Sequence, residues 1–557
     1  MVTLWGSKQN GEQGEDDSSP NPPGSSDGEH SRPNTRSRHQ GDPDERTRLL
    51  PPPPGHGGYL SPDDPAVTPY NLWSVRALRH LTVIFTIITF LWWVLLFISI
   101  FASPPSMNSR GSGYFDISYA LLTIGNLLVA LIFFSIPSTP MSVLGMVVGV
   151  MLLINMILIL AVSRLRAEEG WVGTASVIWA ALMSLYCVLT NKTVRWGKKE
   201  EEERLTGREE TRRSLREWCA VLTASVIMVV LVAVTVLLTA TLILRARDAT
   251  LAPPGERYFV DGDKYQVHVA CVGDRRYDDQ GEAIPTVLVE GGEEPTEGSG
   301  LEDFIYNARV NGTIARYCYW DRPGLAFSEN APSPHSAGMS IDAISEALAI
   351  AGEDGPWILV SAGIGGIYSR IFSSRHVRDV QGIFLIDTLH EDFLHRVGSP
   401  TRGFFLWAWG MISPLGLDRI PAAVFKGRTR EDRVYGPSSY QSGKYLKAKL
   451  QENLVAESFT KSEIMSARRI QPPDTPLVVV SSGVMMKKDK EWEKKQEDLT
   501  KITDNLLAYD VVSGAPHEVW RTLKGREVLE QRLGELFNPK KSNTTVKTAW
   551  KLKPRQD

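Results

Sequence analysis

The chain has 557 residues, more than one ordinary hydrophobic core accommodates, so two or more structural units are expected. Acidic and basic residues nearly balance, 64 against 61, and the formal net charge of −3 argues against a nucleic-acid partner. Four cysteines are too few for a disulfide scaffold, and none lies in a C-x-x-C or Cys/His cluster, so no metal site and no cofactor are expected.

Residues 1–65 are rich in Pro, Gly, Ser and charged side chains and hold few aliphatic residues. Such a segment cannot bury enough apolar surface to offset the entropy of ordering, so we predict a disordered cytosolic tail. Within it, the stretch DERTRLLPPP places three residues between Glu45 and the pair Leu49 and Leu50. This spacing resembles the acidic dileucine signal that sorting adaptors bind, and chance in a low-complexity tail is the equal alternative.

Five apolar runs follow, each long enough to cross a hydrocarbon core of roughly 30 Å at a rise of about 1.5 Å per residue. A buried helix of a soluble protein seldom runs this long without a charge. We therefore predict a five-span region over 66–247, with the lipid bilayer as its partner. The runs lie near 81–103, 117–136, 141–163, 171–190 and 219–244.

Lysines and arginines crowd the loop 192–217, which we expect to form a solvated charged helix. Because basic loops face the cytosol, this loop and the N-terminal tail are predicted to be cytosolic. Everything after the fifth run is then lumenal or extracellular. Arg245 and Arg247, directly after that run, contradict the rule. The interiors of the runs hold no ionisable residue near a midplane, so ion transport is not predicted.

From 250 to 538, short apolar runs alternate with helical patterns, which predicts an α/β domain with a mostly parallel, doubly wound sheet. The insertion 394–465 contains GFFLWAWGMISPLGL, which fits a helical lid over a pocket or a buried cap helix. Residues 539–557 form a basic tail. The candidate strands are KYQVHVACV, TVLVEGG, ARYCYWD, WILVSAG, GIFLID, PLVVVSSG and LAYDVV.

The order of motifs in this domain resembles the α/β-hydrolase superfamily, whereas the membrane half resembles no family that we recognise. PTVLVEGG (285–292) resembles the strand and glycine turn that supply an oxyanion-hole amide. RYCYWDRPGLAFS (316–328) resembles the strand and turn that follow. GPWILVSAGIGGIYSRIF (355–372) resembles the nucleophile elbow and its helix, and SGAPHEVW (513–520) resembles the late histidine loop.

The elbow of these enzymes needs a small-x-Ser-x-Gly turn that lifts the serine hydroxyl above the end of the strand. Aligned on its strand and on its terminal glycines, this chain has Gly363 at the nucleophile position. The turn is therefore degenerate. One alternative remains, because LVSAG loosely fits the motif with Ser361 as a displaced nucleophile, although this shortens the strand.

The resemblance also implies the partners of the missing nucleophile. His517 matches the general base, and Asp387 at the end of GIFLID is the preferred orienting acid. The backbone amides of Ile364 and of Gly291 or Gly292 match the oxyanion hole. The alternatives are structural, with a histidine hydrogen-bonded within its loop and an aspartate that caps the following turn.

In the sheet order of the hydrolases, the strands that carry Cys271 and Cys318 are neighbours, so the resemblance implies a disulfide between them. Two small buried thiols are the alternative. Asn311 and Asn543 each begin an N-glycosylation sequon on the predicted lumenal side. An oxidising compartment would suit both features.

Together these features predict a five-span membrane protein with a lumenal, hydrolase-like domain that does not catalyse. It is expected to bind a small apolar or ester-like ligand or a partner, in an endomembrane such as the vacuole or the Golgi. One alternative is an active esterase or lipase-like enzyme with Ser361 as nucleophile and His517 as base, and another is a membrane scaffold. The alternative locations are the mitochondrial and the plasma membrane.

Overall fold

The computed structural model describes residues 69–107, 109–207 and 214–537. Several predicted features lie outside these ranges, namely the tail 1–65, its sorting signal at Glu45, Leu49 and Leu50, the sequon at Asn543 and the basic tail 539–557.

Five long helices form the N-terminal half of the described chain. Each is long and apolar enough to cross a membrane, judged by length and composition. Large apolar side chains such as Leu91, Ile132 and Leu185 are exposed along them, as expected for surfaces that contact lipid. The five predicted spans are thus confirmed as candidate membrane helices. They are α1 (Trp73–Phe101), α2 (Tyr114–Ile132), α3 (Thr139–Ala161), α4 (Ser163–Thr206) and α5 (Leu215–Asp248).

Helix α4 is longer than its predicted apolar run. It begins before the run, passes through a kink at Gly170, where φ is +63°, and continues into the charged segment. Glycine tolerates this positive φ because it has no Cβ. Beyond the run, Lys198 pairs with Glu202 at 3.7 Å and Lys199 with Glu203 at 3.6 Å. The charged segment is therefore helical with i,i+4 pairs up to Thr206, whereas residues 208–213 of the predicted helix lie outside the described ranges.

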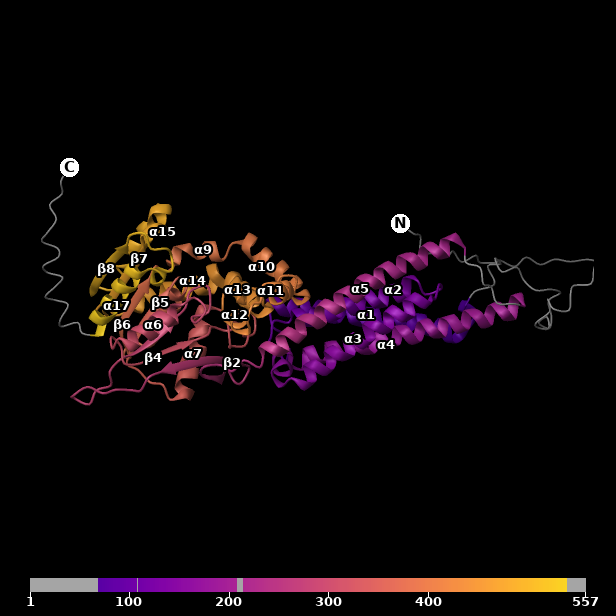
Figure 1. The fold of residues 1–557 in the computed structure, drawn as a ribbon, viewed down its shortest axis with the longest axis horizontal. Helices are drawn as coiled ribbons and strands as arrows, with labels where there is room; N and C mark the ends of the chain where they lie inside the picture. Colours follow the sequence, from indigo (N-terminus) through magenta and orange to yellow (C-terminus); the bar gives the residue numbers. More distant parts are fainter. Residues whose placement is uncertain (1–68, 108, 208–213, 538–557) are drawn as a thin grey trace, which may run out of the picture. The chain divides into compact units, whose positions relative to one another are not determined.

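The C-terminal half, where Figure 1 draws strands as arrows, contains one sheet. It has eight strands in the order β1-β2-β4-β3-β5-β6-β7-β8. Strand β2 is antiparallel to β1 and β4, and all other neighbours run parallel. This is the α/β-hydrolase fold. The strands are β1 (Glu256–Val260), β2 (Tyr265–Val272), β3 (Thr286–Glu290), β4 (Tyr317–Trp320), β5 (Trp357–Ala362), β6 (Val380–Ile386), β7 (Leu477–Ser482) and β8 (Leu506–Val512).

Helices cover both faces of this sheet, as its buried parallel strands require. Ile341 of α7 and Ile367 of α8 lie in the buried cluster on one face. Phe304 of α6 and Leu533 of α17 lie in the cluster on the other. The helices outside the insertion are α6 (Leu301–Val310), α7 (Ala337–Ala351), α8 (Gly365–Arg375), α15 (Gly483–Lys488), α16 (Lys490–Leu499) and α17 (Leu523–Phe537).

The predicted helical insertion lies between β6 and β7 and consists of α9 (Leu394–Val397), α10 (Pro400–Ile412), α11 (Arg419–Phe425), α12 (Arg430–Val434), α13 (Gly443–Val455) and α14 (Lys461–Ile470). It packs against the membrane helices. Leu446 and Leu450 of α13 share a buried cluster with Ile100 of α1 and Ile117 of α2. Short 3-10 or π segments are η2 (Pro69–Asn71), η3 (Glu391–Phe393), η4 (Ser413–Leu415), η5 (Ser439–Gln441), η6 (Ala456–Thr460) and η7 (Val519–Arg521).

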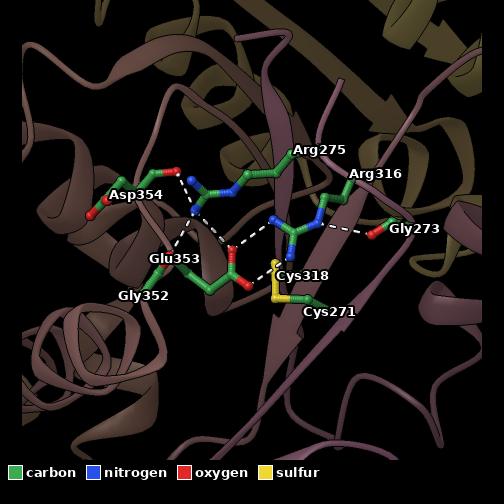
Figure 2. Close-up of a disulfide and its surroundings, with 8 residues drawn as sticks. All are labelled: Cys271, Gly273, Arg275, Arg316, Cys318, Gly352, Glu353 and Asp354. Atoms are coloured by element: carbon green, nitrogen blue, oxygen red, sulfur yellow. Dashed lines mark hydrogen bonds and ion pairs between the residues drawn. A yellow bond between two sulfur atoms is a disulfide. The ribbon is translucent and has the colours of Figure 1, made fainter. Parts of the chain in front are cut away.

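A disulfide joins Cys271 of β2 to Cys318 of β4, as the resemblance implies (Figure 2). The two residues lie directly opposite each other in the antiparallel pair, with their Cα atoms 4.0 Å apart. Beside them, Arg316 donates to both oxygens of Glu353 at 2.6 Å. The disulfide and this ion pair fasten β4 to its surroundings.

Removing the disulfide is expected to destabilise the full-length protein. The cross-link closes a loop of 47 residues, which corresponds to about 4 kcal/mol in the chain-entropy model. Urea unfolding of the detergent-solubilised double variant Cys271→Ser/Cys318→Ser measures this loss. Cys219→Ser, at an exposed free thiol, is the control and should unfold like the wild type. Equal stability of the double variant and the wild type would contradict the prediction.

Candidate functional site

The turn between β5 and α8 has the geometry of a nucleophile elbow. Gly363 follows the end of β5 and has a φ of +52°, a conformation that side-chain-bearing residues adopt only under strain. A Cβ on Gly365 would lie 2.4 Å from the carbonyl oxygen of Gly291, and one on Gly366 would lie 2.5 Å from Cβ of Thr388. These two glycines therefore let α8 pack tightly against the neighbouring turns.

The missing side chain at Gly363 would point at His517. A Cβ built on Gly363 lies 3.3 Å from Nε2 of His517 and 3.4 Å from Cα of Gly292. The position assigned to the nucleophile therefore faces both the assigned base and the assigned oxyanion turn. The structure brings the three together although they lie far apart in the sequence.

His517 and Asp387 form a hydrogen-bonded dyad, with 2.6 Å between Nδ1 and Oδ2. Asp387 is fully buried at the end of β6. Its other oxygen accepts from the backbone N–H of Ser482 at 3.0 Å and from Nε1 of Trp492 at 2.9 Å. These contacts fix the carboxylate, which in turn orients the imidazole so that Nε2 faces Gly363. Trp492 was not among the predicted site residues, because its sequence position gives no sign of this contact.

The protonation of His517 is set by two opposing effects. Burial lowers its pKa, but the hydrogen bond and the charge of Asp387 outweigh burial and raise the pKa above the usual range. The side chain remains 42% exposed, so solvent and small solutes reach the ring. The dyad thus retains the arrangement of a general base although Gly363 offers it no proton.

The predicted oxyanion turn is held by an arginine. Arg322 donates to the carbonyl oxygens of Gly291 at 2.8 Å and Gly292 at 2.5 Å, and to Oε1 of Glu290 at 2.8 Å. Burial raises the pKa of Glu290 to about 7 against the opposing charge of Arg322. The turn therefore has a fixed shape next to Ile364 and the elbow.

Ser361, the alternative nucleophile, lies within β5 and is 0% exposed. Its hydroxyl oxygen accepts a hydrogen bond from Ser369 of α8 at 2.9 Å and its other neighbour is the carbonyl oxygen of Phe384 at 3.5 Å. Among the described contacts, none joins this hydroxyl to His517. The structure brings Gly363 to the dyad and leaves Ser361 in the packing between strand and helix.

The insertion covers the oxyanion turn with charged groups. Lys449 of α13 is 1% exposed and pairs with Glu293 at 3.1 Å and Glu452 at 2.9 Å. Beside Ile364, a cavity of about 10 Å³ lies against Tyr368 and other residues of α8 and the insertion. This volume suffices for about one water molecule. A larger ligand therefore enters this space only if the insertion moves.

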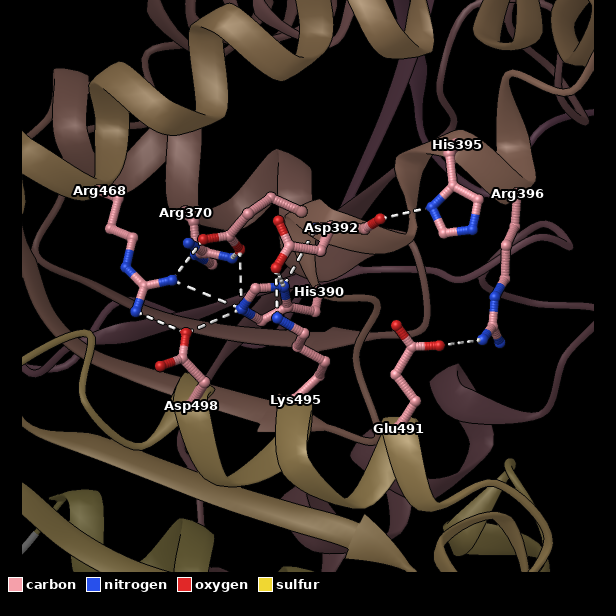
Figure 3. A network of polar contacts seen from close by, with 10 residues as sticks. Arg370, His390, Asp392, His395, Arg396, Arg468, Glu491, Lys495 and Asp498 are labelled. Carbon is pink, nitrogen blue, oxygen red and sulfur yellow. Dashed lines mark hydrogen bonds and ion pairs between the residues drawn. The ribbon is translucent and has the colours of Figure 1, made fainter.

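A polar network holds the segment that follows Asp387 (Figure 3). Nε2 of His390 lies 2.9 Å from Asp498 of α16, and Arg468 of α14 donates to Asp498 at 2.7 Å. Arg468 also donates to Glu391 at 2.5 Å. The network links the segment after β6 to two helices that follow it in the chain and so supports the position of Asp387.

The sequon at Asn311 lies in an exposed turn after α6. Its side-chain amide donates to Glu530 at 2.9 Å, and Thr313 of the same sequon donates to the same oxygen at 2.8 Å. Glycosylation at Asn311 stays a prediction, because exposure permits it without requiring it.

Comparisons with known proteins identify similar chains. A family model described as a region of unknown function (DUF2417) matches residues 45–271. An uncharacterized protein of Schizosaccharomyces pombe is 34% identical over 525 residues, which cover 88% of this chain and 96% of that protein. An uncharacterized vacuolar membrane protein of Saccharomyces cerevisiae is 26% identical over 332 residues, which cover 50% of each chain. This chain thus matches about half the length of the Saccharomyces cerevisiae protein.

Two solved structures similar to the C-terminal half are enzymes. An α/β hydrolase from a Medee basin deep-sea metagenome library is 11% identical, with a TM-score of 0.36, and the match covers 51% of this chain and 97% of that one. A thermophilic esterase from Thermogutta terrifontis is 15% identical, with a TM-score of 0.35, over 51% of this chain and all of the esterase chain.

Proposed function

This chain belongs to the same family as the Schizosaccharomyces pombe protein, and we propose that it is an endomembrane protein whose hydrolase-like domain binds a ligand or partner without hydrolysing it. The observation that carries the proposal is Gly363 in front of the His517–Asp387 dyad. Covalent catalysis needs a nucleophilic side chain, which glycine lacks. The dyad then serves as a polar contact for a bound group.

The proposed location is the vacuolar membrane, with the C-terminal domain in the lumen. The Saccharomyces cerevisiae relative is described as a vacuolar membrane protein, which supports the compartment. The Cys271–Cys318 disulfide supports an oxidising side of the membrane, since cytosolic thiols are kept reduced. The described residues hold five candidate spans, and this odd number supports a topology in which this domain and the N-terminus lie on opposite sides of the membrane.

The proposed ligand is a small molecule with an apolar part. The small cavity beside the elbow is lined mainly by apolar side chains, among them Ile364, Ile367, Leu394 and Val397. An ester or carboxyl group next to Gly363 would lie close to His517 and to the oxyanion turn. Entry requires the insertion to open, as in enzymes that close a lid over a bound ligand.

A second candidate function is hydrolysis, which the intact dyad favours. His517 would act as a general base, with Ser361 or a bound water as nucleophile. In this case the raised pKa of His517 would serve proton transfer rather than ligand binding. The two candidates differ in whether His517 supports turnover.

We expect the detergent-solubilised wild-type protein to remain unlabelled by a fluorophosphonate probe and to hydrolyse p-nitrophenyl butyrate no faster than His517→Ala. The physical reason is the absence of a side-chain nucleophile at Gly363. Gel fluorescence and absorbance report the two reactions. Labelling that disappears in Ser361→Ala, or turnover that disappears in His517→Ala, would replace the binding function by catalysis.

A further inference from the structure

A charged cavity of about 80 Å³ lies where the membrane helices α4 and α5 meet the insertion. We call it the junction cavity. It is distinct from the elbow, since neither His517 nor Gly363 lines it. Its volume exceeds that needed for a single water several-fold and suits a small polyatomic group.

On the membrane side, two arginines and one glutamate from the start of α4 and the end of α5 line the junction cavity. Glu168 of α4 accepts from Arg164 at 3.4 Å and from Arg245 of α5 at 2.9 Å. Arg245 also pairs with Glu169 at 2.5 Å. Both oxygens of Glu168 are therefore already engaged by arginines.

The insertion side repeats this pattern. Asp248, at the end of α5, accepts from Arg433 of α12, with 2.6 Å between Nη2 and Oδ1. Arg419 of α11 donates to its other oxygen. The single carboxylate of Asp248 thus faces two buried guanidinium groups.

Lys444 of α13 adds a fifth cation to this lining. Its Nζ donates to the carbonyl oxygen of Ala326 at 3.2 Å, and no carboxylate of the described residues forms an ion pair with it. Burial lowers the pKa of Lys444 to about 8, with Glu168 opposing that effect. Five cations thus face two carboxylates, and counting Glu169 still leaves an excess of two positive charges.

A neutral donor also faces the junction cavity without a partner. Thr241 of α5 is 1% exposed, and its hydroxyl has no hydrogen-bond partner in the described part of the chain. Buried hydroxyls are normally hydrogen-bonded, since leaving one unpaired costs about 1–3 kcal/mol. Its position in the lining suggests a ligand as the missing acceptor.

We propose that the junction cavity binds a phosphate group. Buried charges are normally paired, and a phosphate monoester carries a charge of about −1.5 to −2, which matches the excess. Its oxygens accept from guanidinium groups, from an ammonium and from a hydroxyl, the donors present here. The ends of α4 and α5 place the cavity where a phospholipid headgroup would lie, while inorganic phosphate offers the same chemistry.

The test compares wild type, Lys444→Gln and the control Lys487→Gln, an exposed lysine outside the cavity. Thermal unfolding of full-length protein in detergent is followed with inorganic phosphate against chloride of equal ionic strength. Nanodiscs of phosphatidylcholine with or without phosphatidic acid supply the lipid phosphate. We expect a phosphate source to raise the unfolding midpoint of wild type and control, with at least about tenfold weaker apparent affinity in Lys444→Gln.

The unfolding midpoints measured without phosphate distinguish a variant that no longer binds phosphate from one that is less stable or misfolded. Without phosphate, Lys444→Gln should unfold no earlier than wild type, because the substitution removes a buried charge that forms no ion pair with a described acid and interacts with Glu168 only at longer range. Stabilisation by phosphatidic acid alone assigns the site to a lipid headgroup, and stabilisation by inorganic phosphate alone assigns it to a soluble anion. Stabilisation by neither source, or equal affinity in Lys444→Gln and Lys487→Gln, overturns the proposal.

Discussion

Gly363→Ser is expected to make the protein react covalently with a fluorophosphonate probe. The new Cβ lies 3.3 Å from Nε2 of His517, so the hydroxyl can reach hydrogen-bonding distance by rotation about χ1 and a small shift of the ring. The turn already has the positive φ of an elbow. A positioned general base contributes about 10²–10⁴ in rate, so labelling should rise at least about 100-fold over the wild type.

Two control variants distinguish the effect of the new hydroxyl from the effect of placing a side chain in this turn. Gly363→Ala introduces the same backbone strain without a nucleophile and should stay unlabelled. Gly363→Ser/His517→Ala should lose the labelling that the single variant gains, because the serine then lacks its base. If Gly363→Ser folds with an unchanged unfolding midpoint and stays unreactive, the turn is not a latent nucleophile elbow.

The labelling of Gly363→Ser should also depend on pH in a defined direction. Only the neutral imidazole accepts a proton, so the rate rises as His517 loses its charge. Because Asp387 raises the pKa of His517, the half-maximal rate should lie above the ordinary histidine value of about 6.5. Asp387→Asn removes the negative charge that favours the protonated imidazole, so the midpoint of the pH profile of labelling should move to lower pH. If the pH midpoint of labelling does not move in Asp387→Asn, Asp387 does not set the pKa of His517.

Protonation of His517 has opposite effects on labelling and on stability, because it prevents labelling but stabilises the folded state. The raised pKa means that the folded state holds the proton of His517 more tightly than the unfolded state does. This contribution to stability is fully present below the unfolded pKa and disappears as the pH rises through the folded one. The same proton that favours folding therefore blocks the base in Gly363→Ser.

Apolar runs and turn glycines were sufficient to predict most of the sheet. The central strands are buried on both faces, so they read as continuous apolar stretches such as WILV before Gly363. Strand β1 was missed because, at the edge of the sheet, only Val260 of its five residues is buried. An edge strand with mostly polar or half-exposed residues carries little periodic signal.

The groups around the site were harder to predict. Asp387 and His517 follow from the order of motifs, but Lys449 and Glu293 come together only because the insertion folds over the oxyanion turn. Their sequence spacing obeys no local rule, since neither i,i+4 periodicity nor strand alternation relates them. The junction cavity is a further case, with ion pairs between residues more than a hundred positions apart, such as Asp248 and Arg433.

Arg245 shows why the positive-inside rule, which counts loop charges, does not hold at the end of α5. It lies at the non-cytosolic end of α5 in the predicted topology, where the positive-inside rule disfavours arginine. In the structure its side chain is only 11% exposed and pairs with Glu168 and Glu169 of α4. A neutralised arginine no longer acts as a free charge at the membrane surface. Arg247, two residues later, is exposed.

Arg245→Met is therefore expected to destabilise the full-length protein by about 3–5 kcal/mol, because it leaves Glu169 buried without its cation. The guanidinium also lies over the ring of Phe115, 4.6 Å from its centroid, and this contact is lost as well. Denaturant unfolding in detergent measures the change. Arg247→Met removes the same charge from an exposed position and should stay within about 0.5 kcal/mol of wild type.

A double variant identifies the cause of that loss. Glu169→Gln removes the carboxylate that Arg245→Met leaves unpaired, so the two substitutions together should cost less than the sum of their separate effects. Full additivity would mean that lost packing on Phe115, not the buried ion pair, sets the stability of this junction. Non-additivity would explain why an arginine persists at this end of α5, since its partner on α4 would otherwise be a buried, uncompensated acid.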